Sequence, residues 1–88
     1  MKLIIAIIRD VDTDPVSRAL MEENLRVTQI ASTGGFLRRG NSTLLIGLED
    51  DQVETALNII RQNCARSADA NDKRAAIFVL NVAHYTHF

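Results

Sequence analysis

The stretch of sequence that decides the fold is residues 42–64, which read STLLIGLEDDQVETALNIIRQNC. The apolar run at 44–46 is typical of a buried strand. Five apolar residues then follow at the spacing of one helix face, i, i+3, i+4, i+7 and i+11: Val53, Ala56, Leu57, Ile60 and Cys64. The acids at 49–51 lie where negative charge favours a helix N-terminus. The stretch therefore predicts a strand over 42–48 and a helix over 53–64.

The N-terminal part of the chain repeats this order of a strand and a helix. Residues 3–8 form a continuous apolar run rich in β-branched residues, which is typical of a strand buried on both faces. The alternating acids at 10–14 predict a solvated turn, in which Asp14 caps a helix whose first residue is Pro15. The helix is expected to end near Asn24, since asparagine tolerates the left-handed conformation of a C-cap.

Two further strands are expected over 25–32 and 75–82, where β-branched and apolar residues dominate. The segments between them predict a loop through Gly40, a polar connector over 65–74 and a short tail over 84–88. The resulting order, β-α-β-β-α-β, predicts an α+β ferredoxin-like sandwich. The 88 residues are too few to split, so residues 1–88 are expected to form a single domain.

One face of this predicted sheet has nothing to cover it. Right-handed crossovers put both helices on the same side of the sheet. The strands at 3–8 and 75–82 nevertheless carry apolar residues on both faces. A bare apolar face of this size indicates an interaction surface. We therefore expect a homo-oligomer that packs through the open face.

Composition excludes several classes of function. The chain has 10 basic and 11 acidic residues and a net charge of −1, which argues against a general DNA- or RNA-binding protein. A lone cysteine, Cys64, continues the apolar helix stripe and is expected to be a small buried residue. The apolar run at 3–8 is too short for a signal peptide or a membrane span, so a cytoplasmic location without membrane insertion is expected.

The segment 24–47 carries the residues best suited to bind a ligand. It has three arginines and no acid, the loop glycines Gly34, Gly35 and Gly40, whose backbones allow close approach, and one aromatic, Phe36. A nucleotide uses such a set, because a base stacks on an aromatic ring and phosphate binds arginine or free N–H groups. The same residues also fit an ordinary glycine-rich hairpin in which Phe36 packs under the loop. Residues alone leave both interpretations open.

No arrangement typical of catalysis is found. The sequence offers no nucleophile beside a base and no carboxylate pair with a pocket, so it predicts a binding protein without a cofactor rather than an enzyme. A metal site would use His84 and His87 with Cys64 or the acids at 69–72, because a metal needs three or four ligands. The alternative is that both tail histidines are solvated or lie at an interface.

The segments NLRVT at 24–28 and TGGFLRRGNST at 33–43, with the opening MKLIIAII and the acids Asp10 and Asp12, resemble the PII-like cyclic di-AMP receptor family. The resemblance runs through residues 1–64 and resumes over the last strand. It implies a ferredoxin-like homotrimer that binds cyclic di-AMP, or a related adenine nucleotide, at three clefts between subunits. It also implies a signalling protein without catalytic activity, in which the ligand orders loops that engage a protein partner of unknown identity.

The resemblance assigns adenine contacts to six positions, namely Arg26, Thr28, Phe36, Leu37, Asn41 and Gly47. Two features depart from the family pattern. The connector at 65–74 is short and lacks glycine and proline, and the tail has His87 where the family carries a glutamine beside its terminal aromatic. A second hypothesis is therefore a structural or metal-binding trimer of CutA-like type, without a nucleotide. Phe36 with Asn41 favours the first hypothesis, and His84 with His87 the second.

Overall fold

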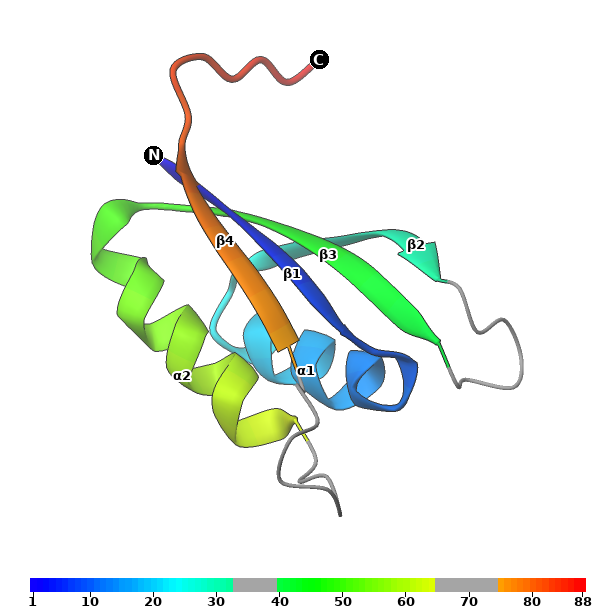
Figure 1. Ribbon diagram of the computed structural model, residues 1–88. Coiled ribbons are helices and arrows are strands. Elements are labelled where there is room, and N and C mark those ends of the chain that lie inside the picture. The colour runs from blue at the N-terminus through cyan, green and yellow to red at the C-terminus, as the bar shows by residue number, and fades with distance from the viewer. Residues whose placement is uncertain (33–39, 65–74) are drawn as a thin grey trace.

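The computed structural model describes residues 1–32, 40–64 and 75–88, without the side chains of residues 31 and 32, and has a ferredoxin-like α+β fold (Figure 1). Its elements are β1 (Lys2–Arg9), α1 (Asp10–Glu22), β2 (Arg26–Ser32), β3 (Asn41–Leu48), a 3-10 turn η2 (Asp50–Gln52), α2 (Val53–Asn63) and β4 (Ala75–Asn81). The strands pair antiparallel in the order β2-β3-β1-β4. Both helices cover the same face of the sheet. The predicted order of elements and the predicted fold class are confirmed.

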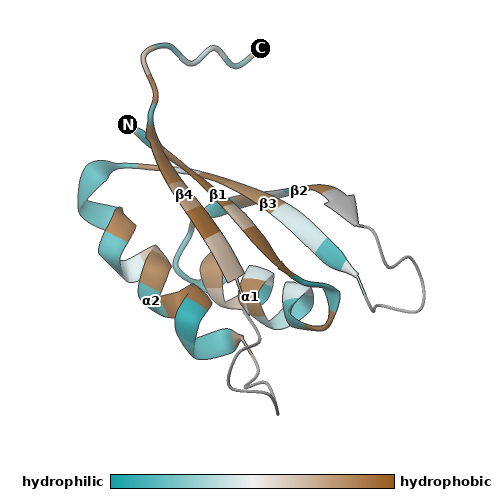
Figure 2. Ribbon diagram, in the orientation of Figure 1, coloured by the Kyte–Doolittle hydropathy of each residue, from teal (hydrophilic) through white to brown (hydrophobic). Residues whose placement is uncertain are grey.

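The hydrophobic core lies between the helices and the even-numbered residues of the two central strands. Ile4, Ala6 and Ile8 of β1 are fully buried there, beside residues of β3 and of both helices. The apolar stripe of α2 faces this core through Ala56 and Ile60, as its spacing predicts. Figure 2 shows apolar colouring along β1 and β4 and in bands that alternate with hydrophilic colouring along the helices. Cys64 closes the stripe and is buried, as expected.

The start of α1 differs from the sequence prediction. The helix begins at Asp10, directly after β1, rather than at Pro15, which lies inside it. Asp10 and Asp12 are 3% and 1% exposed, so the expectation of a solvated acidic turn is wrong. Negative charge in a first helical turn is favourable, because the free N–H groups of the helix face it. The helix therefore uses these acids as buried N-terminal residues.

The buried acids have partners from distant parts of the chain. The Asp10 backbone N–H donates to the Gly40 carbonyl at 2.9 Å, and the Ser42 hydroxyl donates to the Asp10 carboxylate at 2.5 Å. Arg9 Nε donates to Asp12 Oδ2 at 3.0 Å. A buried carboxylate is tolerated only when such groups satisfy it. These contacts tie the start of α1 to the start of β3.

The end of α1 follows the prediction. Asn24 has a φ of 63°, the left-handed conformation expected of a C-cap. The Asn24 N–H donates to the Met21 carbonyl at 2.9 Å, and the Leu25 N–H donates to the Leu20 carbonyl at 3.2 Å. These two bonds form a Schellman motif, in which the apolar residues on either side of the turn share the core.

The opposite face of the sheet is open and apolar, as predicted. The odd-numbered residues of β1 point to it, and Ile7 is 37% exposed. Phe78 and Leu80 of β4 lie on the same face at 54% and 46% exposure, paired across the sheet with Ile5 and Leu3.

Within the described ranges, no helix has the length and apolar character to cross a membrane.

Candidate functional site

A cavity of about 470 Å³ lies on the open face, at the end of the sheet where β1 and β2 begin. Among the described residues, its lining combines apolar, hydroxyl-bearing, cationic and aromatic residues: Met1, Lys2, Leu3, Arg26, Thr28, Leu45, Gly47, Val82 and Tyr85. The residues come from β1, β2, β3 and the segment after β4. The site is therefore built from parts of the chain that only the folded sheet brings together.

Strand register sets the floor of the cavity. Gly47 of β3 pairs with Arg26 of β2 on one side and with Leu3 of β1 on the other. Thr28 and Leu45 form the next pair on the same face, because side chains alternate along a strand. Adjacent strands lie about 4.8 Å apart, so these side chains are immediate neighbours. The cation and the hydroxyl of β2 thus border an apolar strip.

Gly47 opens this strip. In the part of the chain that the structure describes, a Cβ built at Gly47 meets only the Met1 Cε, at 3.5 Å, which is an ordinary van der Waals distance. Its backbone also lies outside the left-handed region that favours glycine. Neither packing within the chain nor backbone conformation requires a glycine at this position. What the missing side chain provides is a bare stretch of backbone at the floor, over which a flat group can lie.

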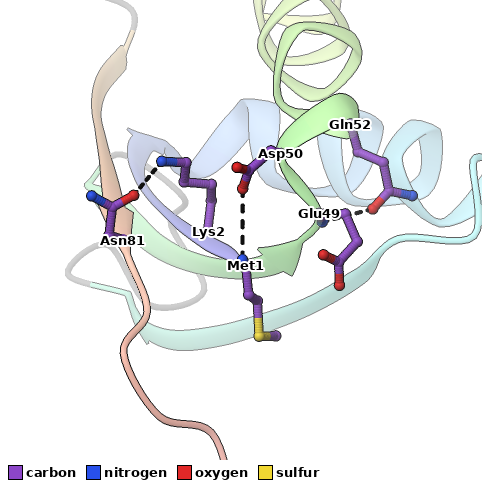
Figure 3. A network of polar contacts seen from close by, with 6 residues as sticks. All are labelled: Met1, Lys2, Glu49, Asp50, Gln52 and Asn81. Atoms are coloured by element: carbon purple, nitrogen blue, oxygen red, sulfur yellow. Dashed lines mark hydrogen bonds and ion pairs between the residues drawn. The ribbon is translucent and has the colours of Figure 1, made fainter.

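Polar contacts hold the edge of the sheet beside the cavity (Figure 3). Lys2 Nζ donates to Asn81 Oδ1 across the β1–β4 pair, and the Met1 ammonium lies 3.6 Å from Asp50 Oδ1. The Glu49 N–H donates to Gln52 Oε1 at 2.9 Å, within a reciprocal cap at the start of η2. These contacts fix the start of β1 between β4 and η2, as Figure 3 shows.

The electrostatics of the cavity favour an anion. Both charged residues of its described lining, Lys2 and Arg26, are cationic. Arg26 lies on the open face, whereas the Lys2 ammonium points to the covered face and binds Asn81. A second cavity of about 330 Å³, beyond the end of β3, is lined instead by Glu23, Glu49 and Asp51. Phosphate oxygens are attracted by guanidinium and ammonium groups and repelled by carboxylates. Of these two cavities, the one on the open face therefore suits an anionic ligand.

The segment after β4 supplies the remaining wall. The Val82 N–H donates to the Met1 carbonyl at 3.1 Å, which carries the pairing of β4 with β1 past Asn81. Tyr85 follows and lines the cavity with a side chain that is 58% exposed. Its ring lies nearly parallel to that of His87, with centroids 6.5 Å apart.

Three of the six sequence-predicted contacts meet at this cavity: Arg26, Thr28 and Gly47. Asn41 is exposed at the other end of β3, beside Arg9, and six residues of strand put it about 20 Å from Gly47. Phe36 and Leu37 lie outside the described residues. Sequence reasoning missed the contributions of Leu3, Leu45 and Tyr85. The alternating pattern of β1 and the aromatic residues of the tail could have indicated these residues. Placing them beside β2, however, requires knowledge of how the strands pair.

The geometry of the tail does not support the alternative of a metal site at His84 and His87. His84 Nε2 lies 2.9 Å from the Thr86 hydroxyl, whereas His87 lies beside Tyr85, so the two imidazoles have different neighbours. Cys64 is buried in the core. Across residues 1–32, 40–64 and 75–88, no cluster of three or more His, Cys, Asp or Glu is suited to a metal. The acids at 69–72 lie outside the described residues.

Comparison with known proteins identifies the family. The profile described as cyclic-di-AMP receptor matches residues 1–73, and the chain belongs to that family. A solved structure of a functionally unknown protein from Pediococcus pentosaceus has the same fold, with 33% sequence identity and a TM-score of 0.80. That match covers 99% of this chain and 96% of the other. It therefore includes β4 and the tail, which lie beyond the residues that the family profile matches.

Proposed function

We propose that the protein is a signalling receptor that binds cyclic di-AMP, or a related adenine nucleotide, in the cavity on the open face of the sheet, and that it is not an enzyme. The observation that carries the proposal is the convergence of Arg26, Thr28 and Gly47 on one cavity whose charged lining is cationic. Family membership supplies the class of ligand.

The lining offers a separate partner to each part of such a ligand. An adenine is flat and apolar on its faces, so it fits the backbone strip at Gly47 and the side chain of Leu45. The Thr28 hydroxyl both donates and accepts, which suits the polar edge of the base. Arg26 supplies donors that phosphate needs. Phe36, Leu37 and Asn41 stay in the proposal as contacts that the family resemblance implies.

The assembly in this proposal is a homotrimer with the ligand in clefts between subunits. The support is physical: the cavity opens on an apolar sheet face that the described part of the chain leaves uncovered. A second subunit that buries Phe78, Leu80 and Ile7 also encloses the cavity and excludes water from it. Exclusion of water strengthens the contacts between cations and phosphate. Loop changes then pass the signal to a protein partner.

Isothermal calorimetry of the purified protein tests the function. The panel is cyclic di-AMP, cyclic di-GMP, AMP, ATP and divalent metals, so that the CutA-like alternative is tested in the same series. We expect saturable binding of cyclic di-AMP, weakened about tenfold or more in Arg26→Ala, because a hydrogen bond to a charged group is lost. Arg18→Ala is the matched control, because it removes the same charge from an exposed position of α1. Absence of cyclic di-AMP binding at millimolar concentration contradicts the proposal.

A further inference from the structure

The tail after β4 places one aromatic ring at the cavity. Tyr85 lines the same cavity as Arg26, Thr28 and Gly47, although 38 residues or more separate it from them in sequence. The bond from the Val82 N–H to the Met1 carbonyl fixes where the tail leaves the sheet. More than half of the Tyr85 side chain is exposed. A ring in this position is a wall of the cavity rather than part of the hydrophobic core.

Contacts within the tail give it two different sides. Tyr85 and His87 lie with their ring planes 13° apart, and His84 pairs with Thr86. Residues two apart are therefore neighbours, which is the alternation of an extended chain. One side of the tail carries the ring that lines the cavity, and the other carries His84.

We propose that Tyr85 is a ligand-contacting residue whose ring covers a nucleobase held over the strip of Gly47 and Leu45. This inference rests on the proposed function and adds a contact that the six sequence-predicted positions do not include. Within the described part of the chain, the cavity lining has one aromatic ring, on the tail, and its strand residues offer apolar and backbone surface. A purine between the two has an apolar partner on each face. Base–aromatic stacking of this kind does not depend on which base is bound, and it would bury a ring that is exposed in the single chain.

Tyrosine fluorescence gives a direct readout of this contact. The chain has one tyrosine and no tryptophan, so its tyrosine emission comes from Tyr85 alone. Titration with cyclic di-AMP is expected to change that emission saturably, with the same dissociation constant as calorimetry. Free N-acetyltyrosinamide, titrated in parallel, corrects for light that the nucleotide absorbs.

Variants test the ring itself. Tyr85→Ala is expected to weaken binding of cyclic di-AMP by about 5- to 150-fold, the range that loss of one base–aromatic stack gives. Tyr85→Phe keeps the ring and is expected to bind within about twofold of the wild type, since the stack is retained. His84→Ala removes the neighbouring ring on the other side of the tail and is the matched control.

The outcomes separate this inference from the proposed function. If the wild type binds in calorimetry while its tyrosine emission stays constant, or while Tyr85→Ala binds as tightly, the Tyr85 contact is wrong and the receptor function stands. If Tyr85→Ala loses affinity because it also dissociates in light scattering, the ring acts between subunits and the inference is again overturned. If the wild type does not bind cyclic di-AMP at all, the proposed function itself fails.

Discussion

The two faces of β1 carry nearly the same side chains in opposite surroundings. Ile4 and Ile8 are fully buried against the helices. Ile7 has the same side chain and lies between them in the sequence, but it is 37% exposed. Helices α1 and α2 cover one face, and the described chain has no element to cover the other. The difference teaches that the apolar residues of β1 exceed what this fold needs for its own core. We expect the surplus to serve an interaction surface, because an exposed apolar face of this kind is typical of one.

The open face is itself divided. On the side of β4 and β1 it stays apolar, through Phe78, Leu80 and Ile7. On the side of β2 and β3, Arg26 and Gly47 introduce charge and bare backbone. The first half suits another subunit, and the second suits a small anionic ligand. Each of the following changes tests one part of this comparison between the covered face and the open face.

The largest effect on stability is expected from adjacent leucines of β3 that point to opposite faces. Leu44 is fully buried and Leu45 is half-buried. Leu44→Ala is expected to lower the free energy of unfolding by about 2–5 kcal/mol, because it leaves a cavity in the core. Leu45→Ala is expected to lower it by about 1 kcal/mol, since less surface is lost. Urea denaturation at equal protein concentrations measures both, and equal losses would contradict the division of the sheet into two faces.

The oligomer is expected to depend on the open face alone. Ile7→Lys puts a charge on that face away from the cavity, and a charge buried without a partner costs several kcal/mol, so the assembly should dissociate. Met21→Lys changes an exposed apolar residue on α1, away from the open face, and should leave the assembly intact. Light scattering at micromolar concentration distinguishes them. A wild-type chain that is monomeric under these conditions would remove the basis for the trimer.

Substitutions of Gly47 are expected to preserve the fold but to weaken ligand binding. The space around a Cβ at this position is sufficient, and alanine restricts the unfolded chain, so Gly47→Ala should keep or raise the melting temperature. Gly47→Val fills the strip further and is expected to weaken cyclic di-AMP binding by about tenfold or more, which corresponds to about 1.4 kcal/mol. Calorimetry and thermal unfolding on both variants provide the check. Full affinity in a folded Gly47→Val protein would exclude a base from the strip.

The smallest effect is expected from salt. Arg26 is exposed in the single chain, and exposed ion pairs contribute about 0.2–1 kcal/mol each. Raising the ionic strength should therefore weaken binding by about 1.5- to 5-fold per pair, because salt screens such charges. The same titration on Arg26→Ala should show a weaker dependence. A dissociation constant for cyclic di-AMP that is independent of salt would place its phosphates away from Arg26.

What the sequence could predict of the fold depended on short-range pattern. The stripe of α2 and the left-handed Asn24 are readable because periodicity and cap chemistry are local. The start of α1 was mispredicted because Asp10 is held by Ser42, which is 32 residues away. No local rule distinguishes an acid that caps a helix in solvent from one that is buried in its first turn.

The candidate site followed the same limit. Arg26, Thr28 and Gly47 were recognisable within one continuous segment, through its resemblance to the family. Tyr85 was not, because its place at the cavity depends on β4 pairing with β1 in the register Lys2 to Asn81. Only the folded sheet relates residues that are so far apart in the chain.

That same pairing has a consequence for how the chain is made. β1 is an inner strand of the sheet, yet its partner β4 begins at Ala75, so the ribosome produces the two strands far apart in time. At about 5–20 residues per second, β1 waits several seconds with one edge of its backbone unpaired. An unpaired apolar edge is a template for aggregation. Nascent chains that stall before β4 therefore carry both an open edge and a cavity that lacks the wall formed by Val82 and Tyr85.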